Sequence, residues 1–145
     1  MNYWNWDSSL AIGIDVIDNQ HKRIVDYINE LNTAIVNKDK DNMFHVLQEL
    51  ADYTITHFAF EESLMDKSAY PFADAHKRVH ESFAGQVTRY QKKFAEGQDI
   101  SKHLRSELQI WLTNHIKKDD KDFAPYVRKL QNKSWLGGLL RRFFG

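Results

Sequence analysis

Four stretches of this chain place apolar side chains three and four residues apart, the spacing of one face of an α-helix. The stretches cover about 17–35, 43–65, 76–94 and 101–115. Short polar or proline-containing segments separate them: NKDKDN at 37–42, Ser68–Phe72 and Glu96–Asp99. Because four helices with short connections pack as an antiparallel bundle, the sequence predicts an all-α fold, an up-down-up-down four-helix bundle.

Two terminal segments fall outside this periodicity. Residues 1–16 carry aromatic side chains and predict an extended N-terminal arm, and Asp15 or Asp18 is expected to cap the first helix. A short C-terminal helical segment is expected around Phe123–Leu130. We therefore expect a bundle over residues 1–131, followed at 132–145 by a tail of apolar and basic residues.

The predicted inward faces also carry polar side chains that an apolar core does not need. They are His21 on the first face, His57 and Glu61 on the second, His76 and His80 on the third, and His115 on the fourth. Burying such groups without a partner costs several kcal/mol by transfer estimates, so a cluster of them predicts a common partner. His45 and His103 do not match the faces and are expected to be solvated.

The spacing and the residue types indicate a metal ion as that partner. His57 and Glu61 lie one helical turn apart, as do His76 and His80, so each pair can reach one centre. The chain has no cysteine, and imidazole with carboxylate suits iron, zinc, copper or nickel. The ligands are too many for one tetrahedral zinc ion, which favours two ions that share carboxylates.

A further carboxylate follows His115, and two residues compete for that role. Asp119 is four residues after His115 and Asp120 is five residues after it. A regular helix places Asp119 nearer the His115 face. Asp120 can reach the same centre only if the helix ends or distorts near residues 116–120, as helices often do at functional sites.

The motifs together resemble those of the hemerythrin family, in its single-domain bacterial form. The matching segments are WDSSLAIGIDVIDNQHK, HFAFEE with Met65 downstream, YPFADAHKRVH and HIKKDD, and they span about residues 4–131. They contain a lone histidine followed by HxxxE, HxxxH and HxxxxD, and the last motif selects Asp120.

The resemblance implies a non-haem di-iron centre. His76, His80 and His115 would hold one iron, and His21 and His57 the other. Glu61 and Asp120 would bridge both ions, together with an oxo or hydroxo group. The iron with two histidines keeps an open position for dioxygen.

The function that follows is reversible dioxygen binding for transport, storage or delivery to a partner enzyme, rather than catalysis. Oxygen or redox sensing through a partner, di-iron chemistry on peroxide or nitric oxide, and iron storage are the alternatives. An apolar pocket should surround the open position. Its candidates are Leu112 first, then Ile24, Val25 and Met65, each one turn from a predicted ligand.

Composition limits the partners. Lys and Arg number 20 and Asp and Glu number 20, so the net charge of zero argues against nucleic-acid binding. No leader and no stretch of about 20 apolar residues is found, which predicts a cytoplasmic location. We also expect a monomer.

The tail over Trp135–Phe144 is expected either to dock on a membrane surface or protein, or to fold back on the bundle.

Overall fold

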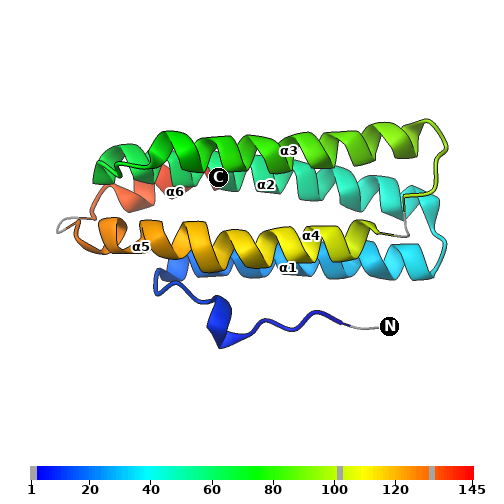
Figure 1. The fold of residues 1–145 in the computed structure, drawn as a ribbon, viewed down its shortest axis with the longest axis horizontal. Coiled ribbons are helices and arrows are strands. Elements are labelled where there is room, and N and C mark those ends of the chain that lie inside the picture. The colour runs from blue at the N-terminus through cyan, green and yellow to red at the C-terminus, as the bar shows by residue number, and fades with distance from the viewer. Residues whose placement is uncertain (1–2, 101–102, 131–132) are drawn as a thin grey trace.

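The computed structural model describes residues 3–100, 103–130 and 133–145, and the regular structure in these ranges is helical throughout. Its long helices run alternately up and down (Figure 1), which confirms the predicted four-helix bundle. The elements are η1 (Ser8–Leu10), α1 (Asp15–Val36), α2 (Lys40–Ser68), α3 (Ala73–Ala95), α4 (Leu104–Asn114), the π-helical segment η2 (His115–Asp120), α5 (Lys121–Arg128) and α6 (Leu136–Phe144).

Some predicted boundaries lie outside the described residues. The fourth helix was expected from about Ser101, and its described part begins at Leu104. The boundary between bundle and tail, at residues 131 and 132, is likewise not described. In the described ranges no helix combines the length and the hydropathy that a membrane crossing requires.

The helices form because each has an apolar face that the others cover. Ile17, Ile24, Ile28 and Leu31 of α1 have no exposed surface and follow the predicted spacing. At the other end of α1, the connection to α2 is tight, and Asp39 caps α2 by accepting a hydrogen bond from the backbone N–H of Asn42.

The N-terminal arm is held along α1 by polar contacts. Asn29 accepts a hydrogen bond from the Trp4 backbone N–H and donates one to the Trp4 carbonyl, both at 2.9 Å. Asp18 accepts from the Ile12 backbone N–H at 2.9 Å. The expectation that an aspartate caps α1 was therefore wrong, because Ile14 is the N-cap residue and α1 has no side-chain cap, while Asp18 fixes the arm instead.

The C-terminal tail folds back on the bundle. Leu139 of α6 is buried, and the Phe144 ring lies 5.5 Å from Tyr53 and 5.7 Å from Phe60, both on α2. The ammonium of Lys67 lies 5.1 Å from the centre of the Trp135 ring. Of the two expectations for the tail, the structure therefore shows the one in which it covers the bundle.

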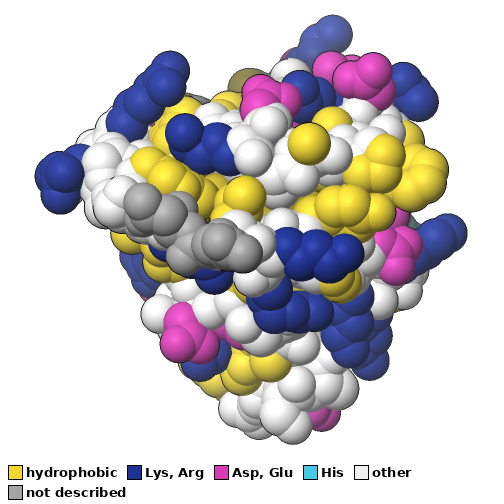
Figure 2. Space-filling view, turned by 90° about the vertical axis from the view of Figure 1, so that its left-hand side faces the viewer, with side chains coloured by type: hydrophobic (Ala, Val, Ile, Leu, Met, Phe, Trp, Pro, Cys, Tyr) yellow, Lys and Arg dark blue, Asp and Glu magenta, His cyan; other side chains and the backbone are white. Residues whose placement is uncertain are grey.

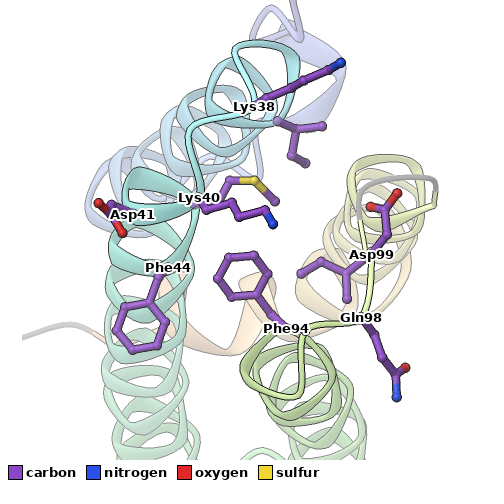
Figure 3. Close-up of a pocket in the computed structure, with 11 residues that line it drawn as sticks. Lys38, Lys40, Asp41, Phe44, Phe94, Gln98 and Asp99 are labelled. Atoms are coloured by element: carbon purple, nitrogen blue, oxygen red, sulfur yellow. The ribbon is translucent and has the colours of Figure 1, made fainter.

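A cavity of about 600 Å³ opens at one end of the bundle, between the α1–α2 turn and the α3–α4 connection. Figure 3 shows Phe94 and Lys40 reaching into this space. The Phe44 and Phe94 rings stack near it at 6.5 Å. The cavity lies at the opposite end of the helices from the histidine cluster described below, so it is not part of that site.

Candidate metal centre

Seven polar side chains meet in the core near the end of the bundle where α2 turns into α3. None of them is more than 4% exposed. Their ligand atoms form two groups, each within 4.8 Å, and Glu61 belongs to both. One group is Glu61, His76, His80, His115 and Asp120, and the other is His21, His57 and Glu61.

Asp120 occupies the middle of this cluster. Its Oδ1 lies 3.1 Å from His76 Nε2 and 3.2 Å from His115 Nε2. Its Oδ2 lies 3.0 Å from His21 Nε2. The two oxygens of one carboxylate thus face histidines from both groups.

Glu61 has a similar position on α2. Its Oε1 lies 3.1 Å from His80 Nε2 and 3.6 Å from His57 Nε2, while its Oε2 lies 4.0 Å from His21 Nε2. His80 Nε2 and His115 Nε2 approach to 3.2 Å. The Nε2 atoms of the histidines therefore point inward, toward the two carboxylates.

A π-helical segment brings Asp120 into the centre. Residues His115–Asp120 form this segment between α4 and α5, which confirms the predicted distortion near 116–120. A π-helix has more residues per turn than an α-helix, so residues five apart share a face. The segment turns Asp120 inward beside His115, whereas Asp119 is only partly buried and its Oδ2 lies 3.0 Å from the outer nitrogen of His115, Nδ1.

Sequence reasoning missed the groups that hold the outer nitrogens of the histidines. His57 Nδ1 lies 2.5 Å from Gln20 Oε1, and His80 Nδ1 lies 3.5 Å from Glu62 Oε2. Asp119 plays this part for His115. Such contacts fix the ring orientation of metal-binding histidines. The available signal was adjacency, because each of these residues directly neighbours one of the seven in the sequence.

Several inward atoms have short contacts but no hydrogen bond. They include His21 Nε2, His57 Nε2, His76 Nε2 and both carboxylate oxygens of Glu61 and Asp120. An unsatisfied buried polar atom is costly, and so many in one place need an explanation. Atoms that converge on shared points rather than on one another are typical of metal ligands.

The ionisation of the metal-free cluster reflects its burial. Desolvation, reinforced by the charge of Asp120, raises the pKa of Glu61 to about 8. Burial lowers the pKa of His57 and of His80. Burial also opposes the charged form of His115, yet the neighbouring Asp120 and Asp119 carboxylates outweigh it and raise the pKa of that imidazole to about 10.

Five imidazoles and two carboxylates without sulfur form a donor set that suits iron and similar divalent metals. In contrast, His45 and His103 are exposed, as predicted, and the His45 ring pairs with Glu49 at 2.8 Å. The cluster can therefore hold metal, and the chain's other two histidines lie outside it.

The four residues predicted to form the pocket are all buried, but they do not lie together. Ile24 and Val25 follow His21 on α1, and Leu112 precedes the end of α4. Because α1 and α4 run in opposite directions (Figure 1), these three lie on the same side of the ligand cluster. Met65 follows Glu61 on α2, which runs parallel to α4, so Met65 lies on the opposite side.

Known proteins match the chain over most of its length. The family model described as "Hemerythrin HHE cation binding domain" matches residues 12–127. A bacteriohemerythrin of Stenotrophomonas maltophilia is 47% identical over 97% of both chains, and one of Pseudomonas aeruginosa is 44% identical over the same share. A bacteriohemerythrin of Methylococcus capsulatus is 35% identical over 86% of this chain and 97% of its own.

The fold agrees with these relatives. A crystal structure of wild-type hemerythrin has a TM-score of 0.82 and 30% identity, and the match covers 87% of this chain and 98% of that one. Family, fold and the buried cluster of histidines and carboxylates give one answer: the chain belongs to the hemerythrin family.

Proposed function

We propose that this protein binds dioxygen reversibly at a non-haem di-iron centre. The observation that carries the proposal is the pair of ligand groups that share Glu61. His76, His80 and His115 would hold one iron, and His21 and His57 the other. Glu61 and Asp120 would bridge the two ions, together with a solvent-derived oxo or hydroxo group.

The unequal histidine count supports a binding role. Three imidazoles belong to one group and two to the other, so an ion held by His21 and His57 would keep a position for an external ligand. When bound, two ferrous ions supply the two electrons that dioxygen needs to bind as a reduced ligand. The protein orients three of the five rings from outside, since Gln20 and Asp119 lie within hydrogen-bond distance of His57 and His115, and Glu62 lies 3.5 Å from His80.

The surroundings favour binding over turnover. Leu112, Ile24 and Val25 are at most 2% exposed, and such an apolar layer excludes the water that promotes irreversible oxidation. The additional carboxylates near the cluster, Glu62 and Asp119, contact the outer nitrogens of histidines rather than the inner face. They are therefore poorly placed to act as general acids or bases on a bound substrate.

Three other functions make different predictions for the same preparation. Di-iron chemistry would consume peroxide or nitric oxide catalytically. Iron storage would take up many ions per chain. Sensing would require a partner whose binding depends on oxygen. Reversible oxygen binding instead predicts a fixed stoichiometry and no net consumption.

The experiment is a stoichiometric one. Metal-free protein is loaded with ferrous iron under anaerobic conditions, and bound iron is measured after gel filtration. Oxygen uptake is then recorded in a closed cell, followed by release under vacuum. The proposal expects two irons per chain and one dioxygen per two irons, recovered on degassing. Uptake of many irons, or oxygen that is consumed and never released, contradicts it.

The tail carries a separate prediction. Arg141 and Arg142 are exposed on α6, and Figure 2 shows Lys and Arg side chains beside hydrophobic ones at this end of the molecule. Docking of Trp135–Phe144 on an anionic membrane would require α6 to leave α2, and it is tested by flotation with acidic vesicles. Exchange of both arginines for glutamate should abolish flotation, and absence of flotation by the wild-type protein contradicts docking.

A further inference from the structure

One buried hydroxyl near the candidate metal centre has no partner. Thr54 of α2 is 2% exposed, and its Oγ1 makes no hydrogen bond. Three other helical threonines behave differently. Thr33, Thr56 and Thr88 each donate to the carbonyl four residues earlier, at 3.1, 2.9 and 2.9 Å. A helix offers this acceptor to every threonine, and Thr54 leaves it unused although its hydroxyl is buried away from water.

Thr54 lies on the face of α2 that carries the predicted ligands. His57 is three residues further along the helix and Glu61 is seven, so Thr54 and Glu61 are separated by only about 20° around the helix axis. Because α2 runs parallel to α4, Thr54 precedes His57 as Leu112 precedes His115. The hydroxyl therefore belongs to the same side of the ligand cluster as Leu112 and Val25.

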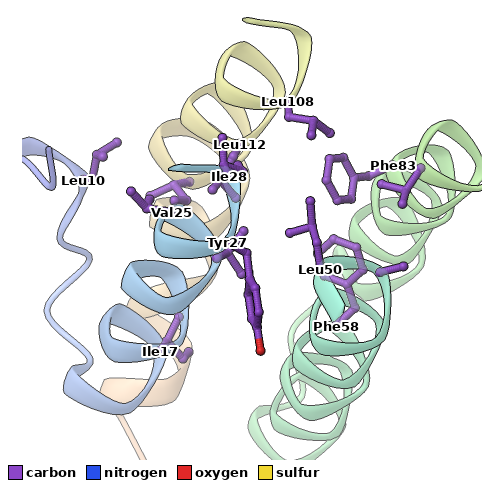
Figure 4. Close-up of a cluster of buried hydrophobic side chains, with 14 of the residues drawn as sticks. Leu10, Ile17, Val25, Tyr27, Ile28, Leu50, Phe58, Phe83, Leu108 and Leu112 are labelled. Atoms are coloured by element: carbon purple, nitrogen blue, oxygen red, sulfur yellow. The ribbon is translucent and has the colours of Figure 1, made fainter. Parts of the chain in front are cut away.

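The buried neighbours of Thr54 one turn away on α2 are hydrocarbon. Leu50 and Phe58 lie four residues before and after Thr54, and both are buried. Figure 4 shows them facing Phe83 and Leu108 across the bundle. A hydroxyl in such surroundings is unfavourable unless something polar joins it there. The second ligand group, with His57, is the nearest polar group on this face of α2.

We propose that the Thr54 hydroxyl donates a hydrogen bond to the external ligand at the open position beside His57, and that the ligand is dioxygen. The inference rests on the proposed function and deepens it, since it names the group that makes the position selective for an oxygen ligand. Dioxygen that has accepted charge from iron is a strong hydrogen-bond acceptor, and a donor in a dry site binds it well. The hydrogen bond slows release of dioxygen and leaves the iron ligands unchanged.

The test compares Thr54→Val, which replaces the hydroxyl by a methyl group, with Thr54→Ser, which keeps the hydroxyl. Thr56→Val on the same helix is the matched control, because Thr56 already donates to Asp52. Dissociation of dioxygen from the iron-loaded proteins is followed by stopped flow. Loss of one hydrogen bond to a charged acceptor should speed dissociation at least tenfold in Thr54→Val. Thr54→Ser and Thr56→Val should stay within about threefold of the wild-type rate.

A second readout uses the metal-free proteins. Removing an unsatisfied hydroxyl from the core should raise the melting temperature of Thr54→Val by about 2–8 °C. This measurement also establishes that the variant folds. A similar rise in Thr56→Val is not expected, because that substitution breaks an existing hydrogen bond.

Each outcome decides the question. A Thr54→Val dissociation rate within twofold of wild type, with a raised melting temperature, shows that the hydroxyl is only a core defect, and the inference fails while the proposed function stands. Equal acceleration in Thr54→Val and Thr54→Ser assigns the effect to lost packing and overturns the inference as well. If the wild-type protein itself never releases dioxygen, the proposed function fails first, and the two failures remain distinct.

Discussion

The buried Glu61 carboxyl makes the stability of the metal-free protein depend on pH, and its substitution by glutamine tests this. Burial and Asp120 raise the pKa of Glu61 from 4.5 to about 8. The folded state therefore binds one more proton than the unfolded state between these two pH values. By linkage, the contribution of Glu61 to the free energy of unfolding is fully present below about pH 4.5 and is lost as pH rises toward 8.

The magnitude follows from the width of that window. Each pH unit inside it changes the free energy of unfolding by about 1.4 kcal/mol, so three units, from pH 5 to 8, remove about 4 kcal/mol. A domain of this size has only about 5–15 kcal/mol in total. The raised pKa of His115, about 10, acts in the same direction above pH 6.5 in both the wild-type protein and the variant. The difference between wild type and Glu61→Gln therefore measures the glutamate together with its charge effect on His115 and Asp120.

The assay is urea unfolding of metal-free protein at several pH values, monitored by helix content. Wild type should lose about 4 kcal/mol more than Glu61→Gln between pH 5 and 8. Glu81→Gln, an exposed glutamate on α3, is the matched control and should follow wild type. Metal loading should remove the contribution of Glu61 to the pH dependence of the wild-type protein near neutral pH, because a bound ion selects the ionised carboxylate. Parallel pH profiles for wild type and Glu61→Gln would refute the reasoning.

Three further predictions concern the surroundings of the centre. Leu112→Ala should speed autoxidation of the iron-loaded protein severalfold in visible spectra, because it opens the apolar layer to water; an unchanged rate counts against a gating role. Asp120→Asn should leave fewer than two irons per chain, because it removes a carboxylate from the centre of the cluster. Asp119→Asn should keep both irons and weaken iron affinity about 10–100-fold in competition titrations, because Asp119 contacts only the outer nitrogen of His115. Equal effects of the two substitutions would contradict these separate roles. Phe144→Ala should lower the free energy of unfolding by about 1–2 kcal/mol, and no loss means that α6 does not pack in solution.

The fold and much of the cluster follow directly from sequence patterns. Apolar residues at helical spacing define four faces, and a helix repeats its geometry closely enough to place His57 over Glu61 and His76 over His80. The histidines and carboxylates on those faces are buried at a cost in free energy, and a shared metal site accounts for that burial. Short connections make the four helices pack as a bundle, and in a bundle the four faces point toward one common core.

Local departures from regular geometry are harder to predict. The HxxxxD spacing indicates a distortion after His115, but only the structure shows that it is a π-helical segment, which keeps the helix continuous into α5. The outer partners of the histidines depend on side-chain rotamers. Gln20 and Glu62 look like ordinary polar neighbours in the sequence until their contacts with ring nitrogens are seen.

Thr54 and the tail illustrate a second limit. Threonine is common on half-apolar faces, so its place in the pattern carries no signal until its hydroxyl is found without a partner. The tail has an apolar face in either arrangement, and only its complementarity to Phe60 and Tyr53 decides that it covers α2. Such complementarity between distant segments is not encoded in local periodicity.

The most direct test of the di-iron proposal is a visible absorption spectrum of the iron-loaded, reduced protein through one oxygenation cycle. Spectra are taken without air, after admission of air and after degassing. Reversible dioxygen binding predicts a charge-transfer band that is absent at first, forms with air and disappears on degassing. A band that never forms, or a spectrum that moves irreversibly to that of the oxidised protein, would contradict reversible binding at this centre.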